Sequence, residues 1–222
     1  VAIVIKAEPS RRAYVRRINI QGNTRTRDEV IRREFRQFES SWYDAEKIRL
    51  SRDRVDRLGY FTELSVTTAE VPGAPDQVDL NVDVKEKPTG NITIGAGYSS
   101  AEKLAFTFGL TQDTAFGSGN KLDLQLNTGK YNRTVVVSAT DPYFTANGVS
   151  RTVDVYYRTQ KPYQDQGGNY TLITMGAGLK FGVPVTELDT VYLGMNAERT
   201  RIKPGTNIPA AYLDYAERFG YT

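Results

Sequence analysis

Few residue groups in this chain have the types and spacing that catalysis or ligand binding requires. The 222 residues include no histidine and no cysteine, which removes imidazole bases, the usual catalytic triads and thiolate metal sites. Residues 117–121 read Gly-Ser-Gly-Asn-Lys, which is half of a phosphate-binding loop, but no helix is predicted after them. The pairs Gly95/Gly97 and Gly176/Gly178 are too short for a dinucleotide-binding fingerprint. The sequence therefore predicts a protein that is not an enzyme and uses no cofactor or metal.

A cluster of basic residues, Arg32, Arg33 and Arg36, could in principle bind a polyanion. Acidic residues are interleaved with it, namely Asp28, Glu29, Glu34 and Glu39. The whole chain is also nearly balanced, with 29 basic and 26 acidic side chains. This pattern favours an ordinary solvated face, with Glu34 as a surface charge, over a nucleic-acid site.

The elements that would position these residues fall into two regions. Residues 1–89 carry 32 of the 55 charged side chains, so a charge-rich region precedes a charge-poor one of 133 residues. The boundary is predicted at Glu86-Lys87-Pro88-Thr89-Gly90, where proline and glycine interrupt regular structure. Val1–Ile5 lacks the features of a signal peptide, and we expect the chain to be a piece of a longer protein.

In the first region, the spacing of apolar residues predicts the order strand, helix, helix, strand, strand. A strand over residues 15–20 precedes a helix that starts with a Thr26–Glu29 capping box. A second helix follows Asp44 and stops at Gly59. The apolar sides of these helices would carry Ile31, Phe35 and Phe38 in the first, and Ala45, Ile48, Val55 and Leu58 in the second. Two alternating strands joined by a turn over residues 71–76 complete a small α+β domain.

The second region contains seven segments in which apolar and polar residues alternate. In the first, residues 90–98, Ile92, Ile94, Ala96 and Tyr98 share one face, and Asn91, Thr93, Gly95 and Gly97 share the other. The polar face of later segments carries charges such as Asp154, Lys180 and Glu198. Unpaired charges are too costly for a dry core, so this face must meet water.

The opposite face of these seven segments is uniformly aliphatic or aromatic, which is more apolar area than a soluble monomer leaves exposed. Lipid outside and water inside satisfies both faces, and this predicts the N-terminal part of an antiparallel transmembrane β-barrel. Seven strands cannot close such a barrel. Residues 141–144 and 182–185 resemble periplasmic turns of outer-membrane barrels, and residues 160–169 and 202–222 are predicted as extracellular loops.

Four runs of residues resemble the POTRA domains of the BamA family of outer-membrane protein insertases. They appear in the family's order, at residues 14–24, 32–37, 57–61 and 71–79. The resemblance implies the end of a preceding POTRA domain at 1–8, a membrane-proximal POTRA domain at 9–87 and barrel strands at 88–222. It also implies an outer-membrane location in a Gram-negative bacterium, with the POTRA part in the periplasm.

By the same resemblance, the partners would be outer-membrane lipid, unfolded outer-membrane proteins and lipoproteins of the BAM complex. The helix bearing Arg33, Glu34 and Arg36 resembles the contact that recruits the lipoprotein BamD. The first barrel strand would be the substrate-pairing edge at a lateral seam, and its residues are Gly90, Asn91, Ile92, Thr93, Ile94, Gly95, Ala96, Gly97 and Tyr98. Two alternatives remain open: a two-partner polypeptide secretion transporter, and a passive barrel with a periplasmic adaptor.

Overall fold

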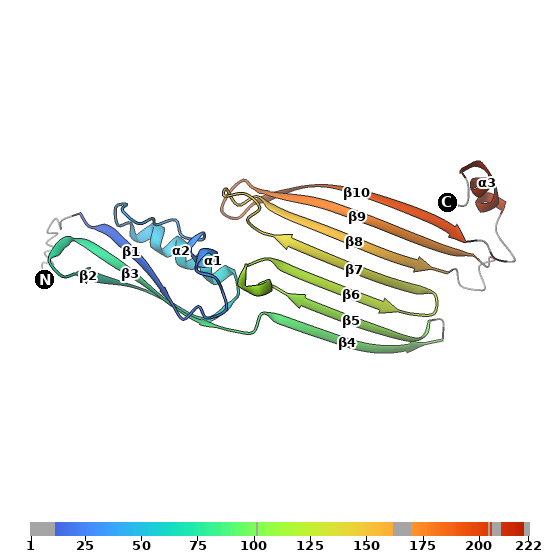
Figure 1. The fold of residues 1–222 in the computed structure, drawn as a ribbon, viewed down its shortest axis with the longest axis horizontal. Coiled ribbons are helices and arrows are strands. Elements are labelled where there is room, and N and C mark those ends of the chain that lie inside the picture. Colours follow the sequence, from blue (N-terminus) through green and yellow to red (C-terminus); the bar gives the residue numbers. More distant parts are fainter. Residues whose placement is uncertain (1–11, 101, 162–169, 204, 206–209, 220–222) are drawn as a thin grey trace, which may run out of the picture. The chain divides into compact units, whose positions relative to one another are not determined.

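The computed structural model describes residues 12–100, 102–161, 170–203, 205 and 210–219, and the chain divides into two compact units (Figure 1). The first unit comprises the residues up to Pro88 together with residues 116–118. The second comprises residues 89–115 and the residues from 119 onward. The segment 1–8, predicted as the end of a preceding domain, lies outside the described residues.

The first unit is a three-stranded sheet covered by helices. Strand β1 (Tyr14–Gln21) runs parallel to β3 (Ala74–Glu86), which pairs on its other side with antiparallel β2 (Phe61–Val71). Helices α1 (Asp28–Arg32) and α2 (Ala45–Arg57) lie between β1 and β2 in the sequence. The predicted order of elements is confirmed. The connector is tighter than predicted, because strand pairing resumes at Ala74 directly after Pro72 and Gly73.

The core of the first unit is made by the alternating strand residues and the apolar sides of the helices. Val15, Leu80, Val82 and Val55 are fully buried, as are Val30 and Ile31 of α1. Helix α2 has the predicted ends: the Asp44 carboxylate accepts hydrogen bonds from the backbone of Glu46 and Lys47, and Gly59 has the left-handed φ of +70°.

The prediction for the first helix is wrong in two respects. Helix α1 has only five residues, and its N-cap residue Arg27 makes no side-chain cap bond. Thr26 does not form the expected capping box; it is buried, and its N–H donates to the Glu86 carboxylate at 2.6 Å. The chain leaves the helix after Arg32, so Phe35 is buried while Phe38 is 64% exposed.

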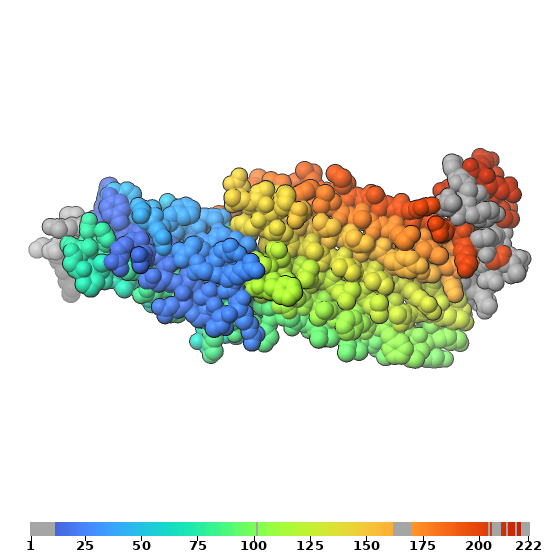
Figure 2. All heavy atoms as spheres, viewed as in Figure 1, coloured from blue at the N-terminus to red at the C-terminus, as the bar shows by residue number. Residues whose placement is uncertain are grey.

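The second unit is one antiparallel sheet of seven strands in sequence order (Figure 1). The strands are β4 (Gly90–Ser99), β5 (Lys103–Gln112), β6 (Lys121–Thr128), β7 (Asn132–Asp141), β8 (Ser150–Gln160), β9 (Thr171–Pro184) and β10 (Thr190–Lys203). A short 3-10 turn, η1 (Ala115–Gly117), lies between β5 and β6. Each strand pairs with its neighbours in the sequence, and Figure 2 shows their side chains forming one continuous surface from green to red. The seven predicted strands are confirmed.

The two faces of this sheet differ as the alternation predicts. The register places Val137 opposite Val155, and Val155 opposite Ala177, so apolar residues form rows across the strands. Many are widely exposed, including Ile94 at 79% and Met195 at 72%. The other face holds polar contacts, such as the hydrogen bond from the Thr111 hydroxyl to Asp123 and the bond from the Tyr156 hydroxyl to Glu198.

Two predicted connectors differ from the structure, and a third lies largely outside the described residues. Strand β9 continues through Gly182, Val183 and Pro184, because these residues pair with β10, and the turn lies after them. The predicted loop over 202–222 contains the end of β10 and helix α3 (Ala210–Phe219). The predicted loop over 160–169 falls largely outside the described residues. None of the described helices is long and apolar enough to cross a membrane.

Candidate functional site

Strand β4 forms one edge of the seven-stranded sheet. It pairs in register with β5 from Gly90 opposite Gln112 to Ser99 opposite Lys103. No other strand in the described part of the chain pairs with its second edge. The predicted site residues Gly90–Tyr98 are therefore brought together in a single strand with one edge open to a further strand.

The side chains of β4 leave this edge lightly packed. Ile92, Ile94 and Tyr98 are 63%, 79% and 75% exposed on the apolar face. On the other face, a Cβ atom added to Gly97 would meet no atom within 4 Å, and one added to Gly95 would lie 3.7 Å from Thr107 Cβ. A Cβ atom would therefore fit at both positions. The glycines therefore lower the strand propensity of β4 without being required by crowding.

Hydrogen bonds outside the β4–β5 ladder add support at both ends of β4. The amide of Gln112 donates to the Thr89 hydroxyl at 2.9 Å, and the backbone N–H of Asp113 donates to the Thr89 carbonyl at 3.2 Å. At the far end, the Glu102 backbone N–H donates to the Ser99 hydroxyl at 2.9 Å. The open edge thus lies between two anchored ends.

Strand β1 is an edge strand of the first unit, and another segment of the chain covers its outer edge. The chain from Ser40 to Trp42 covers it: Val15 exchanges backbone bonds with Ser40 and Ser41, and Tyr14 stacks on Trp42 at 4.1 Å. Further along β1, the Ile18 N–H donates to the Glu39 carboxylate at 2.8 Å. No comparable cover lies on β4 among the described residues.

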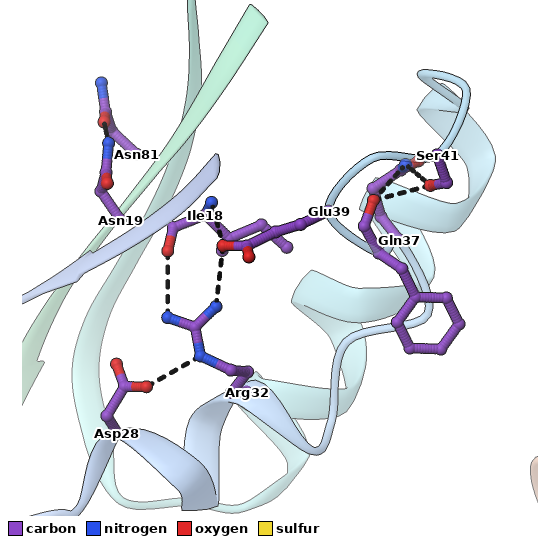
Figure 3. A network of polar contacts seen from close by, with 9 residues as sticks. Ile18, Asn19, Asp28, Arg32, Gln37, Glu39, Ser41 and Asn81 are labelled. Atoms are coloured by element: carbon purple, nitrogen blue, oxygen red, sulfur yellow. Dashed lines mark hydrogen bonds and ion pairs between the residues drawn. The ribbon is translucent and has the colours of Figure 1, made fainter. Parts of the chain in front are cut away.

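Arg32 completes the cover on β1 (Figure 3). Its guanidinium donates to the Ile18 carbonyl at 3.1 Å, to Asp28 at 2.8 Å and to Glu39 at 3.1 Å. These contacts, chiefly the bond to Asp28, raise the pKa of the Arg32 guanidinium above its ordinary value. Arg32 therefore fixes the end of α1 to β1 instead of presenting a free charge.

The second predicted site, Arg33, Glu34 and Arg36, follows α1. The expectation that Glu34 is a surface charge is wrong, because the residue is only 4% exposed. Its carboxylate pairs with the Arg54 guanidinium of α2 at 2.7 Å, and its carbonyl accepts a bond from Arg54 Nε at 3.2 Å. Arg33 and Arg36 are half-buried, and the Arg36 N–H donates to the Ser51 hydroxyl at 2.8 Å.

Sequence reasoning missed the two residues that shape this segment. Gln37 is fully buried, accepts the Asp44 N–H at 3.0 Å, and donates to the Ser41 hydroxyl and the Trp42 carbonyl at 2.7 and 2.9 Å. Ser51 is also fully buried and binds the backbone of Arg36 and Gln37. The available signal was a serine on the apolar side of α2, between Ile48 and Val55.

Two family models match the chain. "POTRA: Surface antigen variable number repeat" matches residues 13–87, and "Omp85 superfamily domain" matches residues 115–218. The first match covers the described sheet and helices of the first unit, and the second covers strands β6 to β10.

Curated relatives similar to this chain are named "Outer membrane protein assembly factor BamA". The protein from Neisseria meningitidis serogroup B is 40% identical over 224 residues, which is 100% of this chain and 28% of the relative. The protein from Nitratidesulfovibrio vulgaris is 31% identical over 189 residues, which is 85% of this chain and 23% of the relative. The chain thus spans about a quarter of the length of these relatives.

Solved structures show the same similarity. The crystal structure of BamA from Haemophilus ducreyi lacking POTRA domains 1–3 matches with a TM-score of 0.75 and 34% identity, over 88% of this chain and 37% of that one. CdiB from Acinetobacter baumannii matches with a TM-score of 0.62 and 13% identity, over 89% of this chain and 40% of that one, which shows a shared fold.

Proposed function

Because this chain belongs to the family of outer-membrane proteins in which POTRA domains precede an Omp85 barrel, we propose that it is part of an assembly factor that inserts β-barrel proteins into the outer membrane. Residues 9–87 would be its membrane-proximal POTRA domain, and residues 88–222 its first barrel strands. Identity of 40% to an assembly factor along the whole chain favours insertion over the alternative of polypeptide secretion.

The observation that supports the mechanism is the light packing of β4, which together with β10 is an edge strand of the described sheet. An unpaired strand edge presents backbone N–H and C=O groups, and an incoming substrate strand can satisfy them by β-augmentation. Strand pairing and the transfer of the substrate's apolar face into lipid would supply the free energy, so the scheme needs no ATP. The light packing of β4 would make it easier for a substrate strand to pair with that edge.

Disulfide crosslinking in the full-length protein tests this proposal. The chain has no cysteine, so every crosslink within it would come from an introduced residue. Cysteines at Thr93 and Gly97 of β4 are compared with cysteines at Thr134 and Ser138 of β7, an interior strand. The substrate is a barrel protein stalled during assembly, with one cysteine in its terminal strand.

Crosslinks at the β4 positions and a background signal at the β7 positions are expected. Equal yields on both strands, or crosslinks confined to β7, would exclude β4 as the pairing edge. A substrate polypeptide that passes through and is released outside, with no crosslink to β4, would support the secretion alternative instead.

For the second site, we propose that Arg33 and Arg36 contact a lipoprotein partner of the assembly complex, with BamD as the candidate that the family resemblance suggests. Glu34 would then act as a positioning residue. Its buried pair with Arg54 fixes the chain between α1 and α2, and so orients the half-buried arginines on either side.

A charge swap separates these roles. Glu34→Lys should lower both the thermal stability of the first unit and the co-purification of BamD, because it places two cations in a buried site. The double variant Glu34→Arg with Arg54→Glu should recover both. If the double variant folds but still fails to recruit BamD, Glu34 contacts the partner directly and the positioning role is wrong.

A further inference from the structure

A groove lies on the apolar face of the sheet, at the ends of β6 to β10 that are farthest from residue 89, to the right in Figure 1. It has a volume of about 440 Å³. Tyr157 and Ile173 contribute its apolar surface. Four cations line it, from the β6–β7 hairpin, the end of β8 and the end of β10: Lys130, Arg133, Lys161 and Lys203.

The position of these cations is unexpected for this face. Arg133 lies opposite Thr159 and two residues before Val135, and Lys203 lies opposite Thr171, so both share the face of the apolar rows. Charged side chains on the lipid side of a barrel are costly near the middle of the bilayer and tolerated only near its surface. Their placement at one end of the strands therefore puts them at the level of lipid headgroups.

The charges are not neutralised within the described residues. Arg133 Nε donates to the Gly129 carbonyl at 3.4 Å, and Lys130 lies 5.0 Å from the centre of the Tyr131 ring. The nearby carboxylate of Glu102 instead accepts bonds from the Tyr131 N–H and the Asn132 amide. None of the four cations forms an ion pair with a carboxylate in the part of the chain that the structure describes.

An apolar groove of about 540 Å³ adjoins this basic groove and shares Val135 and Tyr157 with it. Val137, Val155, Met175 and Ala177 make most of its lining, further from the strand ends, and Glu198 and Arg199 of β10 lie at its border. A cationic site that continues into an apolar channel matches one chemistry, that of a lipid with phosphate groups on its head and acyl chains below.

We propose that this pair of grooves binds a phosphorylated anionic lipid of the outer leaflet. Arg133 and the three lysines hold its phosphates, because guanidinium and ammonium groups form strong charge-assisted hydrogen bonds with phosphate oxygens. The acyl chains lie along the apolar groove. The site is separate from the β4 edge, so the proposal stands whether or not β4 pairs with substrates.

Native mass spectrometry of the full-length protein in a nonionic detergent, titrated with bisphosphorylated lipid A, tests the proposal. The groove variant replaces Lys130, Arg133, Lys161 and Lys203 by glutamine. The matched control replaces four cations of the polar face by glutamine, namely Lys103, Lys121, Arg158 and Lys180. Heat-modifiable gel mobility verifies that both variants form the barrel.

The groove variant should bind lipid A at least about tenfold more weakly, since each cation near an anionic headgroup contributes to affinity. The control should bind as the parent protein does, and dephosphorylated lipid A should bind as weakly as the groove variant binds the intact lipid. Unchanged binding by the folded groove variant would overturn the proposal. So would displacement of the lipid by an equal concentration of inorganic pyrophosphate, which would indicate a site for soluble phosphate.

Discussion

At the scale of single residues, buried polar side chains determine the course of the chain between α1 and α2. Gln37 holds both sides of the turn that covers β1, and Ser51 binds the backbone that enters this turn. The Glu34–Arg54 ion pair holds the chain at Glu34, between the end of α1 and this turn. All of these groups are satisfied locally, so removing one leaves its buried partner without a hydrogen bond.

Gln37→Leu should lower the free energy of unfolding of the first unit by about 1–3 kcal/mol, because the Asp44 N–H and the Trp42 carbonyl lose their partner. Trp42, the chain's only tryptophan, stacks on Tyr14 and provides the fluorescence signal for urea unfolding. Gln21→Leu at an exposed position of β1 is the control. Equal losses in the two variants would refute the role of Gln37.

We expect Glu86 to make the stability of the first unit depend on pH. Burial tends to raise the pKa of Glu86, but hydrogen bonds from the Thr26 N–H, the Thr24 hydroxyl and the Arg25 N–H prevail and lower it. Because the pKa of Glu86 is lower in the folded state, the ionised carboxylate contributes its full stability above the unfolded pKa of about 4.3. This contribution is lost as the pH falls through the folded pKa.

The urea midpoint of the Trp42 signal should therefore decrease below about pH 4.3, and Glu86→Gln should reduce that decrease. The same substitution at exposed Glu70 of β2 is the control. A pH profile that Glu86→Gln leaves unaltered would show that these hydrogen bonds do not favour the ionised carboxylate.

At the scale of elements, the sequence predicted every strand of both sheets and the whole of α2. Alternation of apolar residues is a local signal that repeats along each strand, and Asp44 and Gly59 mark the ends of α2 with their own chemistry. Helix α1 was predicted too long, because Ile31, Phe35 and Phe38 have helical spacing while the bonds that end the helix come from Ser51, distant in sequence. The burial of Glu34 depends likewise on Arg54, and no local pattern signals it.

Substituting a glycine of β4 tests whether the low strand propensity of β4 affects the rate of barrel insertion. Gly97→Ala has open space, and Gly109→Ala of β5 has ordinary contacts, the nearest at 3.5 Å to Thr93 Cβ. Each alanine should stabilise its strand by about 0.5–1 kcal/mol. If β4 exchanges partners during assembly, Gly97→Ala should slow barrel insertion into vesicles by about two- to fivefold, whereas Gly109→Ala should not. Equal rates for the two full-length variants would count against exchange at β4.

At the scale of the whole molecule, the second unit is a sheet between two solvents. Its buried apolar residues are few: within the described strands β4 to β10, no large apolar side chain is fully buried. The row of Val137, Val155 and Ala177 is on the face suited to lipid, and the row of Asp123, Ser138 and Asp154 is on the face suited to water. The sequence predicted this division because it depends only on alternation, but the grooves on the apolar face depend on side chains from five strands and were not predicted.

Substitutions at two adjacent residues of β7 test whether one face of the sheet meets lipid and the other meets water. Val137→Arg should destabilise the full-length barrel by about 2–4 kcal/mol, because it places a charge on the lipid face. Ser138→Arg should be neutral or stabilising, since this position lies between Asp123 and Asp154 on the polar face. The folded fraction in lipid vesicles, read by heat-modifiable mobility across a urea series, measures both. Equal penalties would mean that both faces meet the same solvent.

The unequal lengths of the strands have a consequence for the membrane itself. Strand β6 has eight residues, whereas β9 and β10 have 14 each. At about 3.3 Å per residue, these lengths correspond to roughly 26 Å and 46 Å. These lengths predict a thinner bilayer beside β6 than beside β9 and β10. A lipid layer thinned beside β6 would resist the entry of a new strand less there than along β9 and β10.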